Sequence, residues 1–274
     1  MSVPTFRLTN ELTVVTGASG GIAHALVETL LVYGAPLALV DRNMEALHRT
    51  RDAMVRFCVE EANIKEEDVP KMECFTCNIG DAGEVETLFG EIYNVFQRYP
   101  LHMVNCAGYC ENFAAVDYPA QNAHDLMGVN LLGAFYLSQC FAKPLIEHNI
   151  SGGSIVLIAS MSGKIVNTPQ NQCIYNASKA GVIHLAKSLA AEWGALMHPI
   201  RVNTLSPGYT ATPLTRNVVS GDASLAAEWT RRVPLGRMAH PREMAGAVLF
   251  LLANDASSYT TGEDVLVDGG YSVW

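Results

Sequence analysis

Tyr175 and Lys179 stand four residues apart in a segment whose small and apolar residues recur every four positions, which is typical of a helix. On a helix both side chains project from one face, where the ammonium can lower the pKa of the phenol. A tyrosine tuned in this way can act as a general acid or base on a hydroxyl or a carbonyl. The alternative interpretation is an amphipathic helix with an incidental Tyr/Lys pair.

Ser162 lies thirteen residues before Tyr175, just past a β-rich run at 154–160. Open α/β sheets bind their ligands at the carboxyl ends of the strands, so a hydroxyl at this place can orient a substrate oxygen. Together the three side chains predict a site for proton transfer to or from an alcohol or carbonyl.

A glycine-rich turn at 16–23 follows the first β-rich run and opens a helical segment. Gly17 permits the tight turn, Gly21 lets the backbone approach a ligand, and the helix N-terminus offers N–H donors to a pyrophosphate. Such turns also occur for packing reasons alone. The turn indicates a dinucleotide site only in combination with other residues.

Asp41 ends the second β-rich run, where a carboxylate can accept hydrogen bonds from ribose hydroxyls and repel a 2′-phosphate. Alternatively, Asp41 caps the helix that begins near Asn43, although Asn43 itself could fill that role. The neighbouring Arg42 could bind a 2′-phosphate, but the glycine turn contains no Lys or Arg. The sequence therefore favours NAD over NADP.

These residues must be positioned by alternating strands and helices. The β-rich runs are 12–16, 36–41, 72–78, 103–106, 154–160, 201–206 and 264–268. Longer segments of helical period separate them, which predicts an α/β fold with a doubly wound parallel sheet and helices on both faces. No linker or repeat divides the chain, so residues 1–274 are expected to form a single domain of the Rossmann type. The irregular region 212–237, with Ser220-Gly221-Asp222, is the candidate substrate lid.

Composition excludes several other classes of protein. The 274 residues are 49% hydrophobic and 16% charged with a net charge of −9, which favours a folded chain and disfavours nucleic acid as a partner. We find no signal peptide and no apolar stretch long enough for a membrane span, and seven scattered cysteines suit a reducing compartment, so we expect a cytoplasmic protein. Cys74-x-x-Cys77 and Cys106-x-x-x-Cys110 have no completing ligands, so no metal site is expected.

Five motifs in order, over nearly the whole chain, resemble the short-chain dehydrogenase/reductase family of the compact type without a separate substrate domain. The motifs are the turn at 16–23, Asn105-Cys106-Ala107-Gly108, Ser162 with Tyr175-x-x-x-Lys179, Pro207-Gly208 and Val267-Asp268-Gly269-Gly270. Three departures are Ala23, Cys106 and Asn78, where the family usually has glycine, asparagine and aspartate.

The resemblance implies a catalytic set of Asn130, Ser162, Tyr175 and Lys179, in which Asn130 holds water in a proton relay from Lys179. It also implies a set of cofactor contacts, with Thr212 at the nicotinamide carboxamide and Asn78 beside the adenine. This set is Gly17, Ser19, Gly21, Ile22, Asp41, Asn78, Asn105, Tyr175, Lys179, Pro207 and Thr212.

The strings at 171–179, 206–209, 212–217 and 269–274 are similar to the polyol branch of this family. The resemblance implies NAD-dependent oxidation of a sugar alcohol to a ketose. The first reaction that it implies is D-arabinitol to D-ribulose. Gln172, expected on the helical face of Tyr175, and Asn112 are the candidates to bind substrate hydroxyls, because a site that selects a polyol needs buried polar partners. The alternatives are a sorbitol-, mannitol- or xylitol-type dehydrogenase, a carbonyl reductase, or a dinucleotide-sensing interaction protein.

The expected helices at 122–149 and 172–195 carry apolar residues beyond one stripe. This pattern fits the homotetramer that the family resemblance implies.

Overall fold

A computed structural model of the chain describes residues 3–213, 215 and 223–273, and in this part all seven strands form one parallel sheet of order β3-β2-β1-β4-β5-β6-β7. The strands are β1 (Thr13–Thr16), β2 (Leu37–Asp41), β3 (Met72–Thr76), β4 (His102–Asn105), β5 (Ser154–Ile158), β6 (Arg201–Pro207) and β7 (Asp264–Val267). Each expected run is a strand whose ends differ by two residues or fewer. The predicted doubly wound fold is confirmed.

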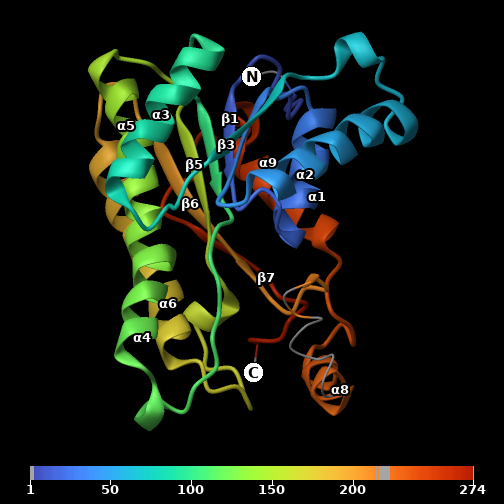
Figure 1. Cartoon of the computed structure of the whole chain (residues 1–274), viewed down its shortest axis with the longest axis vertical. Helices are drawn as coiled ribbons and strands as arrows, with labels where there is room; N and C mark the ends of the chain where they lie inside the picture. Colours follow the sequence, from blue (N-terminus) through green and yellow to red (C-terminus); the bar gives the residue numbers. More distant parts are fainter. Residues whose placement is uncertain (1–2, 214, 216–222, 274) are drawn as a thin grey trace.

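Helices cover both faces of this sheet (Figure 1). One face carries α3 (Ala82–Phe96), α4 (Ala120–Met127), α5 (Gly133–Glu147) and α6 (Cys173–Gly194), and the other α1 (Gly21–Val32), α2 (Met44–Arg56) and α9 (Ala245–Leu252). A buried apolar core fills each interface, and the neighbours Val14 and Val15 of β1 belong to opposite cores. This alternation follows from the two-residue period of a strand.

Shorter helical segments connect these elements. They are π-helical at Phe57–Glu61 and Gly128–Leu132, 3-10 at Glu66–Asp68, Ala115–Asp117, Met161–Gly163 and Pro241–Met244, and α-helical in α8 (Ala223–Arg232) and α10 (Asn254–Ser257). The expected helix at 122–149 is therefore interrupted by a π-turn, which carries Asn130. Single π-turns inside helices frequently occur at functional sites.

The crevice between β1 and β4 is where the order of the strands reverses, and open sheets bind ligands at such a point. The loops that follow these two strands touch: Gly17 has φ +60, and a Cβ on it would lie 2.8 Å from the Cα of Ala107. Only glycine fits here, for its conformation and for packing together.

Within the expected lid region 212–237, α8 is described, whereas Ser220-Gly221-Asp222 lies outside the described residues. Trp229 of α8 is buried and stacks on Tyr209, which follows β6. None of the described helices is long and apolar enough to cross a membrane. In the described part of the chain, no three His, Cys, Asp or Glu side chains gather into a group that could hold a metal ion.

Candidate active site

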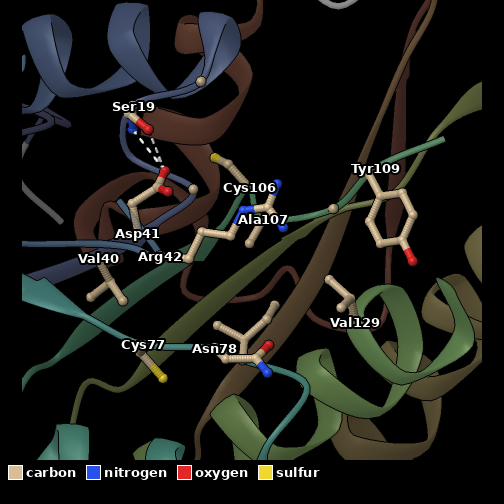
Figure 2. A pocket seen from close by; sticks show the side chains of 14 residues that line it. Ser19, Val40, Asp41, Arg42, Cys77, Asn78, Cys106, Ala107, Tyr109 and Val129 are labelled. Carbon is tan, nitrogen blue, oxygen red and sulfur yellow. Dashed lines mark hydrogen bonds between the residues drawn. The ribbon is translucent and has the colours of Figure 1, made fainter. Parts of the chain in front are cut away.

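The loops after β1, β2, β3 and β4 enclose a cavity that we call the turn cavity (Figure 2). Gly20, the N-cap residue of α1, lines it, and neither a side-chain cap nor an acidic residue occupies the first turn of that helix. The N–H groups of this turn and the helix dipole therefore favour an anionic group, which fits the diphosphate of a dinucleotide. The lining is Gly17, Ser19, Gly20, Val40, Asp41, Arg42, Cys77, Asn78, Ile79, Cys106, Ala107, Gly108, Tyr109 and Val129.

Asp41 projects into the turn cavity from the end of β2 and accepts hydrogen bonds from the backbone N–H (3.3 Å) and the hydroxyl of Ser19 (Figure 2). Asn43, and not Asp41, caps α2, because its side chain accepts a hydrogen bond from the Ala46 N–H at 3.0 Å. The capping alternative for Asp41 is thus wrong. The exposed Arg42 lines the same cavity, so residues of opposite charge line it together.

A second space, the tyrosine cavity, shares Cys106, Gly108 and Tyr109 with the turn cavity and continues it toward α6. Tyr175 and Lys179 line it from the first two turns of that helix, as the i, i+4 spacing predicts. Lys179 is buried, and its Nζ donates to the Ile158 carbonyl at 2.8 Å and lies 5.8 Å from the centre of the Tyr175 ring.

In the protein without a ligand, burial is the largest influence on the pKa values of Tyr175 and Lys179. It raises the pKa of Tyr175 to about 12, against a lowering effect of a hydrogen bond from Ser160. It lowers the pKa of Lys179 to about 8, because the low-dielectric surroundings disfavour the ammonium. Lys179 is not among the causes of the Tyr175 shift in the protein alone, so its expected lowering of the phenol pKa stays a prediction.

Two serines, Ser160 and Ser162, line cavities together with Tyr175. Ser160 lines the tyrosine cavity with Tyr175 and lowers the pKa of its phenol, and the Ser160 hydroxyl oxygen accepts a hydrogen bond from the Ser162 N–H at 3.1 Å. Ser162 sits in the following 3-10 turn and is 5% exposed; its hydroxyl donates to Asn167 Oδ1 at 2.6 Å and accepts from Gln172 Nε2 at 3.2 Å. The Ser162 hydroxyl therefore donates and accepts hydrogen bonds within the protein. Ser162 still lines a neighbouring cavity together with Tyr175, so its role stays a prediction, and the structure adds Ser160, which sequence reasoning missed, as a second candidate.

Two of the expected asparagines are held inside the protein. Asn105 is 4% exposed and accepts hydrogen bonds from the Thr16 hydroxyl (2.6 Å) and the Ala107 N–H (3.2 Å), so it joins β1 to the loop after β4; its contact with the cofactor stays a prediction. The Asn130 side chain accepts from the Tyr109 N–H at 3.0 Å and donates to the Tyr109 carbonyl at 2.9 Å and to Ser178 at 3.1 Å. It fixes the loop at Gly108, where a Cβ would lie 3.4 Å from Lys179 Nζ.

The remaining expected cofactor residues divide between the two cavities. Asn78 lines the turn cavity, and Ile22, Pro207 and Thr212 line the tyrosine cavity. A Cβ on Gly21 would lie 2.9 Å from Thr212 Cβ and 2.8 Å from Pro213 Cδ, so a glycine here lets the segment after β6 pack against the start of α1. Tyr175, Lys179 and these residues together follow one continuous crevice.

A third space of about 130 Å³, the amide cavity, meets the tyrosine cavity at Ser160 and Tyr175 and is rich in amide and hydroxyl groups. Gln172 lies there, but as the N-cap residue of α6 and not on its helical face, which corrects that expectation. Asn112 lies there too and is exposed. The lining is Cys110, Asn112, Ser160, Met161, Ser162, Asn167, Gln170, Gln172, Tyr175, Pro207, Gly208, Tyr209, Thr215 and Trp229.

Comparisons with known proteins show which proteins the chain is similar to. A family model described as enoyl-(acyl carrier protein) reductase matches residues 17–272. The chain is 52% identical to an NADH-dependent L-xylulose reductase of Ambrosiozyma monospora (99% of this chain, 98% of that protein) and 50% identical to a D-arabinitol 2-dehydrogenase (ribulose-forming) of Candida tropicalis (99% and 96%). A crystal structure of a short-chain type dehydrogenase/reductase from Mycobacterium marinum superposes with a TM-score of 0.86 at 33% identity, covering 97% of each chain.

Proposed function

This chain belongs to the short-chain dehydrogenase/reductase family, and we propose that it oxidises a sugar alcohol to a ketose with NAD, D-arabinitol to D-ribulose first among its substrates. The observation that carries the proposal is the position of Tyr175 and Ser160, where the crevice for a dinucleotide meets a cavity lined by amides and hydroxyls. A sugar alcohol presents a row of hydroxyls, and a site built from polar partners selects such a substrate over one that lacks them. The names of the two relatives, both acting on five-carbon sugars or alcohols, support the same substrate class.

In this proposal Tyr175, as the phenolate, takes the proton of the reacting hydroxyl, and Ser160 donates a hydrogen bond to the same oxygen. Bound NAD supplies the acceptor for the hydride that leaves the adjacent carbon. Lys179 binds the nicotinamide ribose and supports the phenolate, and the turn that holds Asn130 carries the water link to Lys179. In the reverse direction the protonated tyrosine returns the proton to the carbonyl oxygen.

The residues that would hold NAD are those of the crevice: the turn 17–22, Asp41, Asn78, Pro207 and Thr212. The Ser162 hydroxyl, Gln172 and Asn112 remain in the proposal as residues of the substrate site, with Ser162 and Gln172 acting through Asn167. The segment 212–237 is proposed as the lid, since Thr215 and Trp229 line the amide cavity. A cytoplasmic homotetramer completes the proposal; the exposed apolar side chains of Leu132, just before α5, and Ile146, within α5, support a subunit interface.

We expect Asp41→Ala to improve the use of NADP at least tenfold in kcat/KM, relative to NAD, because a carboxylate beside the ribose repels a 2′-phosphate while Arg42 remains to attract it. Initial rates with both dinucleotides measure the ratio. Asn43→Ala is the matched control, since it removes the cap of α2 but keeps the charge of Asp41. Unaltered NADP kinetics in Asp41→Ala, or the same change in the control, would mean that the carboxylate does not select the cofactor.

The substrate proposal is tested with NADH and the four 2-ketopentoses. D-Ribulose and L-xylulose share the configuration at C3 and differ at C4, whereas D-xylulose and L-ribulose have the opposite configuration at C3. We expect the first two to be reduced with kcat/KM values roughly ten- to a hundredfold above the second two, because a misplaced hydroxyl next to the reacting carbon leaves buried polar groups unpaired.

Reduction of simple ketones at rates equal to those of the favoured ketoses would instead indicate a general carbonyl reductase. Binding of NADH without turnover of any alcohol or ketone would indicate a dinucleotide-sensing protein.

A further inference from the structure

Three side chains of the amide cavity lie away from the place where it meets the tyrosine cavity. Gln170, Tyr209 and Trp229 line the amide cavity, whereas the tyrosine cavity is lined by none of them. They come from three distant segments: the loop before α6, the turn after β6, and α8. Any substrate whose reacting carbon lies at Tyr175 would have its far end toward these three residues.

We call these three residues the end wall of the amide cavity. Trp229 is tightly packed in it. It is 2% exposed and lies flat on the Tyr209 ring, with the ring centres 4.2 Å apart and the planes 6° apart. Tyr271 packs edge-on against Tyr209 at 5.2 Å, and buried Met161 and Val233 complete this small aromatic core. Because packed interiors yield little, the indole has no room to retreat from a longer ligand.

Gln170 forms the polar part of the wall. An indole N–H can only donate, so the Gln170 amide oxygen faces Trp229 Nε1 at 3.0 Å, and it also accepts from the Tyr209 hydroxyl at 3.2 Å. The Gln170 amide nitrogen then donates one hydrogen to the Thr168 carbonyl at 3.2 Å. An amide carries two hydrogens, so the second is left for a hydroxyl in the cavity.

We propose that Trp229 and Gln170 determine the specificity for the chain length of the sugar alcohol. Trp229 fills the space that a sixth carbon would occupy, and Gln170 binds the far hydroxyl of a five-carbon chain. This inference rests on the proposed function and adds to it the residues that set chain length. Arg232 of α8 provides a matched control. It donates to the Thr168 hydroxyl and pairs with Glu228, so it holds α8 against the same loop without lining the amide cavity.

The experiment compares kcat/KM for D-arabinitol with that for D-mannitol and D-sorbitol, using NAD and the full chain. Trp229→Leu is expected to raise the hexitol-to-arabinitol ratio by about tenfold or more, and Trp229→Phe to raise it less, as their smaller side chains open the wall by different amounts. Arg232→Ala is expected to leave the ratio at the wild-type value. Near-ultraviolet circular dichroism and thermal unfolding report whether each variant keeps its fold.

The inference is overturned if both Trp229 variants keep the wild-type ratio, or if Arg232→Ala shifts it equally, because the effect would then come from loosening α8. Should Trp229→Leu fail to fold, Trp229→Phe decides alone. Wild-type protein that oxidises no sugar alcohol at all would contradict the proposed function itself. If the enzyme is active on D-arabinitol but the Trp229 variants leave the hexitol-to-arabinitol ratio unchanged, only the proposed role of the end wall in chain-length specificity is contradicted.

Discussion

Tyr175→Phe is expected to lower kcat for D-arabinitol oxidation by roughly a thousandfold, since general acid–base catalysis by a positioned side chain contributes on the order of 10² to 10⁴ in rate. The substitution deletes one hydroxyl, that of a residue which lines both the tyrosine and the amide cavity. The ring remains, so the packing around Lys179 is retained. NADH affinity, measured by fluorescence titration, should therefore stay close to the wild-type value.

Tyr109→Phe is the matched control for this substitution. Its phenol lines the same tyrosine cavity, but it has no assigned part in proton transfer, so kcat should stay within about threefold of wild type. A folded Tyr175→Phe protein that keeps a tenth or more of the wild-type kcat would show that another group moves the proton.

The second large effect separates the two serines that follow β5. Ser160→Ala should lower kcat by about 10² to 10³, the usual cost of removing one hydrogen-bond donor from the oxygen on which charge develops. Ser162→Ala should lower kcat by less than about tenfold, because its hydroxyl binds Asn167 and Gln172 rather than the substrate. It should instead raise KM, as those two amides lose a shared partner.

Initial rates over a range of D-arabinitol concentrations separate the two parameters for each variant. Equal losses of kcat in both variants would mean that the two hydroxyls act together. A larger loss in Ser162→Ala would restore the interpretation based on its spacing from Tyr175.

The sheet could be predicted from sequence because a buried parallel strand has a short apolar β-rich run with few competing patterns. Tyr175 and Lys179 could be predicted for a similar reason, since an i, i+4 spacing has one geometric meaning on a helix. The glycine turn and Asp41 were predictable because the turn follows β1 and Asp41 ends β2, and the carboxyl ends of parallel strands meet at one edge.

The choice between Ser160 and Ser162 could not be made in this way. Both follow β5, and the 3-10 turn at Met161–Gly163 directs the second hydroxyl into the protein. The signal that could have pointed to Ser160 is its place at the end of the β-rich run 154–160, two residues past the end of β5. The hydrogen bond of Asn105 to Thr16 could not be predicted, because a residue at the end of a strand can face the neighbouring strand as well as the crevice. Tyr209, Gln170 and Trp229 were missed because they come from three segments, and no local pattern reports a contact between them.

The central claim is that this crevice and cavity together oxidise a sugar alcohol with NAD. The most direct test is the initial rate of NADH formation at 340 nm with purified wild-type protein, D-arabinitol and NAD, followed by identification of the ketose that is formed. We expect saturable turnover, D-ribulose as the product, and a kcat/KM for NAD well above that for NADP. No NADH formation with D-arabinitol, xylitol, sorbitol or mannitol, in a folded protein that binds NADH, would contradict the claim.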